Sequence, residues 1–140
     1  MKQAKITSGL EDYMEAISNN IKTNGKVRPI DIARELNVSR ASVSEALRRL
    51  AELGFITYGR YGVISMTQEG EYAAESVIKR HNLLKIFLCD VLGLDENEAA
   101  DNACKIEHVI SANMIDRFDK FVIFCKNNQK FTSKFLDENK

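Results

Sequence analysis

Cysteine, glutamate and histidine stand close together in one stretch of the chain, Cys104-Lys105-Ile106-Glu107-His108. On a helix, residues three or four positions apart share a face, so the side chains of Cys104, Glu107 and His108 would converge. A thiolate, a carboxylate and an imidazole are ligand types for transition metal ions. The spacing therefore suggests a metal site, although a cysteine buried as a small hydrophobe beside chance neighbours would give the same pattern.

Further candidate ligands lie elsewhere in the sequence. Asp12 and Glu15 are three residues apart in the first predicted helix, where acidic side chains also complement the helix dipole without any metal. His81 is the other imidazole of the chain. The three cysteines are widely spaced and form no CxxC pair, which excludes a zinc ribbon and argues against a disulfide framework.

Positive charge is concentrated in one segment of a chain that is neutral overall. The 140 residues hold 20 Lys and Arg against 20 Asp and Glu, a balance that would speak against nucleic-acid binding. Residues 22–61, however, contain eight basic and four acidic side chains and have a formal charge of +4, whereas residues 1–21 have −1 and residues 62–140 have −3. The neutral average thus hides a basic segment between two acidic ones.

The elements predicted around the basic segment have the order of a winged helix-turn-helix. Helices are expected over residues 8–22, 29–36 and 40–53, and Thr7, Pro29 and Ser39 are suitable residues to begin them. The β-prone runs 55–58 and 63–66 flank a glycine-containing loop and predict a hairpin, which would be the wing. The N-terminal end of the third helix would then enter the major groove of DNA.

The residues expected to contact DNA share an outward position on this predicted unit. Small hydroxyl side chains and an arginine at the start of the third helix can read base edges or bind phosphates. The other arginines are candidates for phosphate contacts, and two of the residues stand at the tip of the wing. The candidate set comprises Arg28, Ser39, Arg40, Ala41, Ser42, Ser44, Arg48, Arg49, Arg60 and Tyr61.

The remainder of the chain is predicted to be helical. A long helix is expected from Thr67 to about Val91, followed by helices from Asp95 or Glu96 to Ile110 and from Ser111 to Cys125. The fold class is therefore mainly α. The expected domains are a winged helix-turn-helix over residues 1–66, an all-helical domain over 67–126, and a polar tail or frayed helix over 127–140. No apolar run is long enough to span a bilayer, and the N-terminus lacks a signal-peptide core, which predicts a cytoplasmic protein with no membrane partner.

Three motifs resemble the metal-dependent repressors of the diphtheria toxin repressor and manganese transport regulator family. They are residues 10–17, residues 79–84, and residues 103–111 followed by Ile115-Asp116-Arg117, and the resemblance extends over about residues 8–125. It implies a winged helix joined to a helical metal-binding and dimerisation domain, without the SH3-like third domain of longer members. Family members bind operator DNA when loaded with Mn(II) or Fe(II), and usually repress metal uptake genes.

The resemblance also implies a set of metal ligands. Asp12, Glu15 and His81 match the manganese branch, Glu107 and His108 match both branches, and Cys104 matches the iron branch. We expect a primary site of Asp12, Cys104, Glu107 and His108, with Glu15 and His81 completing a second or enlarged site for one or two ions of Mn(II) or Fe(II) per subunit. The iron branch has an additional acid four residues after the histidine of the long helix, where this chain has Lys85.

These expectations together predict a metal-responsive transcriptional regulator. The resemblance implies a homodimer that represses metal ion uptake genes, and a two-fold symmetric dimer predicts a palindromic operator. The thiolate favours Fe(II), whereas the carboxylates favour Mn(II) as well. A metal-independent winged-helix regulator is the alternative. An enzyme is not expected, because the sequence has no HExxH motif, no glycine-rich phosphate loop and no nucleophile motif with a paired base.

Overall fold

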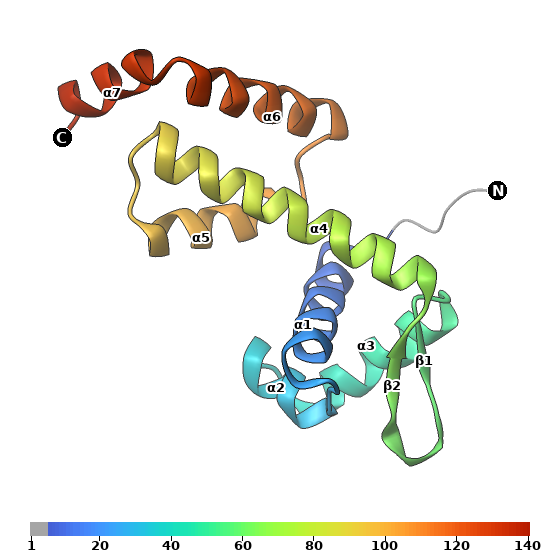
Figure 1. Cartoon of the computed structure of the whole chain (residues 1–140). Helices are drawn as coiled ribbons and strands as arrows, with labels where there is room; N and C mark the ends of the chain where they lie inside the picture. The colour runs from blue at the N-terminus through green and yellow to red at the C-terminus, as the bar shows by residue number, and fades with distance from the viewer. Residues whose placement is uncertain (1–5) are drawn as a thin grey trace. The chain divides into compact units, whose positions relative to one another are not determined.

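The computed structural model describes residues 6–140, which form two compact units (Figure 1). The first unit ends at Val77 and the second begins at Ile78, so that the boundary falls inside helix α4 (Gln68–Ile86). The protein is mainly helical, as predicted. Among the described residues, no helix combines the length and the apolar character needed to cross a membrane.

The first three helices begin at residues that satisfy their free backbone N–H groups. Helix α1 (Ser8–Asn24) is capped by Thr7, and helix α3 (Arg40–Glu52) by Ser39, whose Oγ accepts the N–H of Ser42 at 3.1 Å. Helix α2 (Pro29–Leu36) begins at the proline. The observed bounds of α2 are those predicted, and those of α1 and α3 differ from prediction by two residues or fewer at each end.

The first core lies where these helices meet. It includes the fully buried side chains Ile17, Ile32, Val43, Leu47 and Leu50, which recur at helical spacing on α1, α2 and α3. Burying this apolar stripe is what fixes the three helices against one another, since short helices are marginal in isolation.

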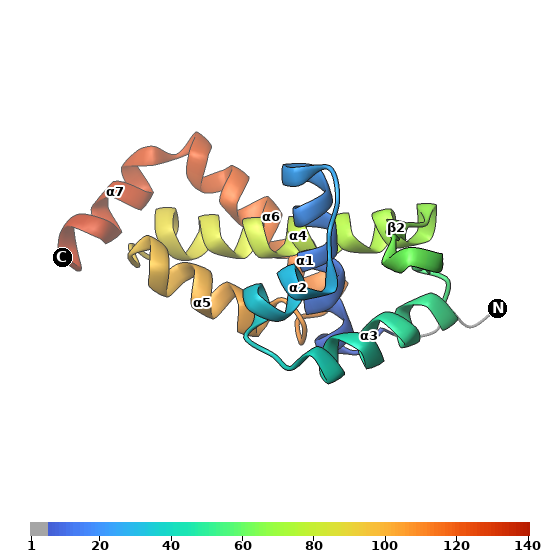
Figure 2. The same cartoon turned by 90° about the horizontal axis from the view of Figure 1, so that it is seen from below.

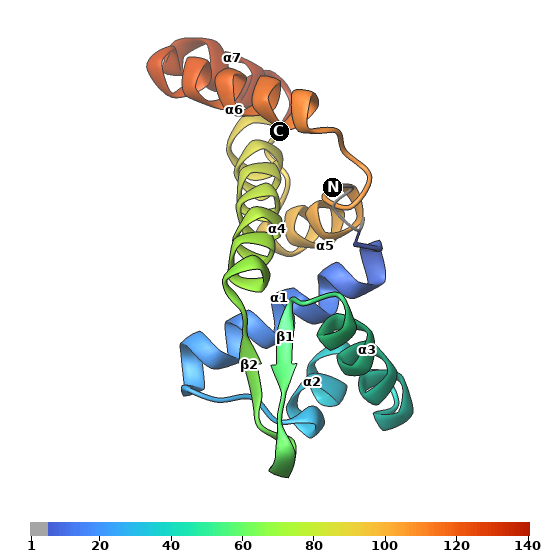
Figure 3. The ribbon, with the colours of Figure 1, turned by 90° about the vertical axis from the view of Figure 1, so that its right-hand side faces the viewer.

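A two-stranded hairpin follows α3 and forms the predicted wing (Figure 3). Strand β1 (Ile56–Tyr58) pairs antiparallel with β2 (Ile64–Met66), with Ile56 opposite Met66 and Tyr58 opposite Ile64. Ile56 and Ile64 are buried in the first core, while the tip, Arg60–Gly62, is exposed. The unit is thus a winged helix-turn-helix.

Gly70, in the first turn of α4, lies against the start of the hairpin. A Cβ at this position would be 1.9 Å from the carbonyl oxygen of Phe55, which already accepts the N–H of Thr67 at 3.1 Å. We expect Gly70→Ala to lower the free energy of unfolding by about 1–3 kcal/mol, because the backbone must move to admit a methyl group. Gly9→Ala on α1 is the matched control, since a Cβ there meets nothing within 4 Å. Urea denaturation of both variants measures the effect, and equal stability of the two would contradict the predicted overlap.

The second unit packs its helices around the C-terminal end of α4. That end continues as a π-helical turn, η2 (Phe87–Val91), and is followed by α5 (Glu96–Ile106), α6 (Ala112–Asn127) and α7 (Gln129–Glu138). Leu84 and Leu88 pack on Ala99 and Ala103, whose small side chains let α5 approach closely. Figures 1 and 2 show α5 on one side of this end of α4 and the α6–α7 pair on the other.

Helix α5 is shorter than predicted, and the end of the chain is helical. The helix predicted to reach Ile110 ends at Ile106, with residues 107–109 in a turn, so that prediction was four residues too long. The sequence predicts a polar tail or a frayed helix over residues 127–140, and the structure has the helix α7 there. Leu136 of α7 packs closely on Gly93. A Cβ added at Gly93 would lie 2.8 Å from Cδ2 of Leu136. This contact anchors α7 to the loop after η2.

Candidate metal centre and candidate nucleic-acid interface

Side chains from α4 and α5 meet at one point of the second unit. His81 lies on α4, Cys104 in the last turn of α5, and Glu107 at the residue after that helix. The N–H of Glu107 still donates to the carbonyl of Ala103 at 2.9 Å, so helical geometry persists to residue 107. Cys104 and Glu107 are therefore one turn apart on the same face, as their spacing predicted.

The three potential ligand atoms of His81, Cys104 and Glu107 lie within 4.8 Å of one another. Nδ1 of His81 is 2.8 Å from Oε2 of Glu107 and 3.7 Å from Sγ of Cys104. One imidazole nitrogen thus faces both a carboxylate oxygen and a sulfur. The three atoms are therefore close enough to bind one cation together.

Burial distinguishes Glu107 from the other charged residues. Its side chain is 0% exposed, and it is the one acidic or basic residue that is fully buried in the part of the chain described. A buried carboxylate is costly unless cations or hydrogen-bond donors compensate it. Imidazole, thiolate and carboxylate are together a donor set for a divalent transition metal, with the sulfur favouring Fe(II) over Mn(II). The residues present therefore fit such an ion.

His108 joins this group from outside the helix. Its Nε2 lies 3.4 Å from Oε1 of Glu107, and its side chain is largely buried. The expectation that His108 shares a helical face with Cys104 was wrong, because α5 ends at Ile106 and His108 belongs to the following turn. The turn nevertheless brings its imidazole to the same carboxylate.

The remaining predicted ligands belong to the first unit. Asp12 and Glu15 lie on α1, three residues apart, and both side chains are half-buried. Their participation in metal binding stays a prediction.

Lys85 forms an ion pair with Glu96. Lys85 stands at the position where the iron branch of the family described above has an additional acid. Nζ of Lys85 lies 2.9 Å from Oε1 of Glu96. This hydrogen bond raises the pKa of Lys85 and lowers the pKa of Glu96. A lysine held in its cationic form disfavours a second cation there.

The ten residues predicted to contact DNA are all exposed and lie on the first unit. Arg40, Ala41, Ser42 and Ser44 occupy the first turns of α3, the end that a recognition helix presents to the major groove. Ser39 caps α3, as predicted, and its hydroxyl also donates to Oγ of Ser42 at 2.9 Å, so this side chain is engaged within the protein.

The arginines of this set differ in how far their charge is compensated. Arg48 forms ion pairs with Glu45 and Glu52, and Arg28 donates two hydrogen bonds to Asp31. Nη1 of Arg49 lies 3.7 Å from Oε2 of Glu52. Arg40 and Arg60 make no ion pair with any residue from 6 to 140. Two uncompensated arginines thus mark the start of α3 and the tip of the wing.

The ion pairs of Arg48 were not predicted, although the spacing of charged residues along α3 indicates them. Glu45 and Glu52 stand three residues before and four residues after Arg48, which are the spacings at which helical side chains pair. The hydrogen bond from Arg48 lowers the pKa of Glu45, so the pair is charged at neutral pH.

The wing tip holds an aromatic side chain in an unfavourable backbone conformation. Tyr61 has φ +71° and ψ 14°, in the left-handed region that favours glycine, and its side chain is 101% exposed. Packing within the protein does not account for a tyrosine at this position. Exposure next to Arg60 is consistent with the predicted contact to DNA.

Comparisons with known proteins agree with this division of roles. Residues 5–64 match the model of the iron dependent repressor N-terminal DNA binding domain, and residues 67–134 match that of the iron dependent repressor metal binding and dimerisation domain. The chain is 34% identical over 136 residues to the HTH-type transcriptional regulator MntR of Listeria monocytogenes, covering 96% of this chain and 95% of the relative. It is also 34% identical over 118 residues to an uncharacterized HTH-type transcriptional regulator of Methanocaldococcus jannaschii, covering 84% of this chain and 94% of the relative.

Solved structures of metal-dependent repressors are also similar to this chain. A manganese-dependent transcriptional repressor in complex with manganese is similar with a TM-score of 0.76 and 32% identity. The match covers 82% of this chain and 53% of that one. The chain therefore spans about half the length of this solved relative.

Proposed function

Because the chain belongs to the family of iron dependent repressors, we propose that it is a metal-responsive transcriptional regulator that represses metal ion uptake genes. The observation that supports this most directly is the meeting of His81, Cys104 and Glu107 in the unit matched by the metal-binding domain. The winged helix-turn-helix of the first unit supplies the means to bind DNA.

The metal would be held by Cys104, Glu107 and His108 with His81 beside them. Asp12 and Glu15 of α1 would add oxygen ligands, as the resemblance of their motif implies. The site would take Mn(II) or Fe(II), one or two ions per subunit. When bound, the ion supplies the positive charge that a cluster containing a buried carboxylate needs.

The operator would be palindromic and the protein a homodimer. Support comes from exposed aromatic side chains on the last two helices: Phe121, Phe124, Phe131 and Phe135. Phe121 stacks on Phe124 with ring centroids 6.2 Å apart, and Phe124 meets Phe131 edge-on at 6.0 Å. An exposed aromatic surface of this kind marks a protein–protein contact more often than a solvated face.

Metal titration of DNA binding tests the proposal. Apo protein and a labelled fragment of an uptake-gene promoter would be followed by fluorescence anisotropy, with Mn(II), anaerobic Fe(II) and Zn(II) added separately. We expect Mn(II) or Fe(II) to tighten binding by at least about tenfold, a typical allosteric coupling. Equal affinity with and without metal would contradict the proposal and favour the metal-independent regulator.

Substituting the thiol should change which metal binds best. We expect Cys104→Ser to weaken Fe(II) and Co(II) binding by at least about tenfold and Mn(II) binding much less, because the hard hydroxyl replaces a soft donor. Competition with a fluorescent chelator measures the affinities. The sulfur-to-cobalt charge-transfer absorption of the Co(II) protein should disappear in the variant.

Cys89→Ser is the matched control, since it changes a thiol of the same unit outside the cluster. It should leave both the affinities and the absorption unchanged. If Cys104→Ser also retained the wild-type metal preference, Cys104 would not be a ligand.

A further inference from the structure

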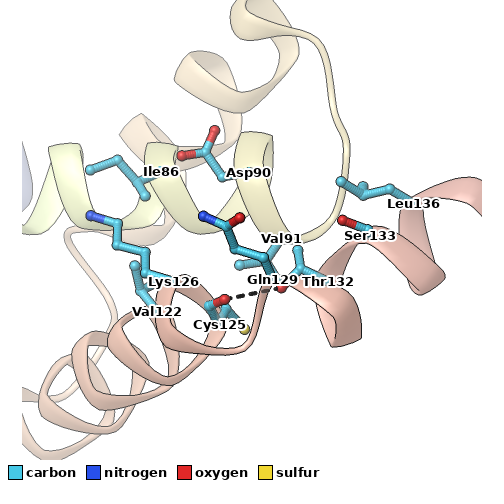
Figure 4. A pocket seen from close by; sticks show the side chains of 10 residues that line it. All are labelled: Ile86, Asp90, Val91, Val122, Cys125, Lys126, Gln129, Thr132, Ser133 and Leu136. Atoms are coloured by element: carbon cyan, nitrogen blue, oxygen red, sulfur yellow. Dashed lines mark hydrogen bonds between the residues drawn. The ribbon is translucent and has the colours of Figure 1, made fainter.

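A cavity of about 220 Å³ lies in the second unit, between η2 and the junction of α6 with α7 (Figure 4). Val91, Val122 and Cys125 line it with apolar atoms and are almost fully buried. Asp90 projects from the η2 side, and Lys126 and Gln129 from the α6–α7 side. The cavity thus has an apolar floor and a polar rim, the usual composition of a small-molecule site.

The two charged groups on the rim are not used by the protein itself. Neither Asp90 nor Lys126 forms a hydrogen bond or an ion pair with any residue of the described chain. The hydroxyl of Thr132 is committed, since it donates to the carbonyl of Cys125 at 3.5 Å. A carboxylate and an ammonium group are therefore both available to a ligand.

The wall that holds Asp90 has an irregular backbone. The N–H of Leu92 donates to the carbonyl of Phe87 at 3.2 Å, a bond between residues five apart that belongs to the π-helical turn. Such single turns are frequent at functional sites, because the extra residue turns side chains away from a regular helical face. Here the turn includes Asp90 and Val91, one from the rim and one from the floor.

We propose that this cavity binds a small zwitterion with an aliphatic side chain, the chemical class of the branched α-amino acids. The ammonium group of the ligand would pair with Asp90, its carboxylate with Lys126, and its side chain would contact the apolar floor. A ligand of single charge would leave one of the two rim groups unmatched. This site is separate from the metal cluster and does not depend on the proposed DNA-binding function.

Isothermal titration calorimetry of the full chain with L-leucine tests the proposal. We expect saturable binding of one L-leucine per chain. 4-Methylpentanoate, which lacks the amino group, and 3-methylbutylamine, which lacks the carboxylate, should each bind at least about tenfold more weakly, because each loses one charged hydrogen-bond partner.

Two variants test which charged group of the ligand pairs with Asp90 and which pairs with Lys126. Asp90→Asn should weaken binding of L-leucine and 3-methylbutylamine by about tenfold and leave binding of 4-methylpentanoate unchanged. Lys126→Gln should weaken binding of L-leucine and 4-methylpentanoate by about tenfold and leave binding of 3-methylbutylamine unchanged. Asp119→Asn and Lys130→Gln, exposed charges outside the cavity, are the matched controls and should have no effect.

Absence of saturable L-leucine binding would overturn the proposal, and so would equal affinity for the three compounds. Occupation of the cavity by a side chain of a second copy would also exclude L-leucine and would count against it. Metal-dependent DNA binding can succeed or fail independently of these results.

Discussion

Glu107→Gln should abolish metal-activated DNA binding while the protein stays folded. The substitution preserves the shape of the side chain but replaces an anionic ligand with a neutral amide. Loss of a partner that only orients a metal ligand already lowers metal affinity about 10- to 100-fold, so loss of a direct ligand should reach at least the upper end of that range. Anisotropy with Mn(II) or anaerobic Fe(II) would then show the affinity of the apo protein at every metal concentration.

Thermal unfolding separates this loss of function from a loss of structure. A ligand that binds only the folded protein stabilises it by about 2.7 kcal/mol at 100 times its Kd, so metal should raise the Tm of the wild type and not that of the variant. Without metal, we expect the variant to remain folded, because its amide oxygen can still accept a hydrogen bond from His81.

Glu98→Gln is the control, because Glu98 lies on the same helix α5 and is exposed. It should bind metal and DNA as the wild type does. A Glu107→Gln protein that kept its metal response would show that the buried carboxylate is not a ligand.

The part of the metal cluster that sequence could predict is the part that lies within one helix. Cys104 and Glu107 are one turn apart, and helical periodicity alone brings them to one face. His81 is 23 residues before Cys104 on another helix. No spacing rule states which face of α4 meets α5, so that residue was inferred from a family resemblance.

Helix starts were predicted better than helix ends, for a physical reason. Thr7, Ser39 and Ser111 cap helices with side-chain oxygens, and such residues are visible in the sequence. The end of α5 at Ile106 has no glycine or proline to mark it, and the apolar residues Val109 and Ile110 continue the helical pattern beyond it. The cavity beneath α7 could not be predicted, since it arises from packing between distant segments.

Some of the arginines predicted to contact DNA already have an acidic partner within the protein. The formal charge of +4 for residues 22–61 counts both partners of these pairs, and it does not show which arginines are engaged. Of the five arginines in the predicted DNA-contacting set, Arg40 and Arg60 make no ion pair within residues 6–140. Since phosphate contacts provide much of the affinity for DNA, Arg40 and Arg60 are the members of this set from which we expect the largest contribution to binding.

Arg40→Ala should weaken operator binding strongly and leave the fold at least as stable. Arg40 is the first residue of α3, where a positive charge opposes the helix dipole, so its removal costs the helix nothing. Loss of a forked contact to a base or phosphate should lower the affinity by about 1–3 kcal/mol, roughly 5- to 150-fold. Anisotropy with saturating Mn(II) at fixed salt measures the affinity, and urea denaturation measures the stability.

Two further variants decide what Arg40 contacts. Arg40→Lys keeps the charge but not the planar fork, so it should restore most of the affinity if the contact is a phosphate and little of it if the contact is a base edge. Arg34→Ala, an exposed arginine on α2 outside the predicted contact set, should stay within about twofold of the wild type, as expected where no contact is lost. If Arg40→Ala bound the operator as tightly as Arg34→Ala, the N-terminal end of α3 would not be the DNA-reading surface.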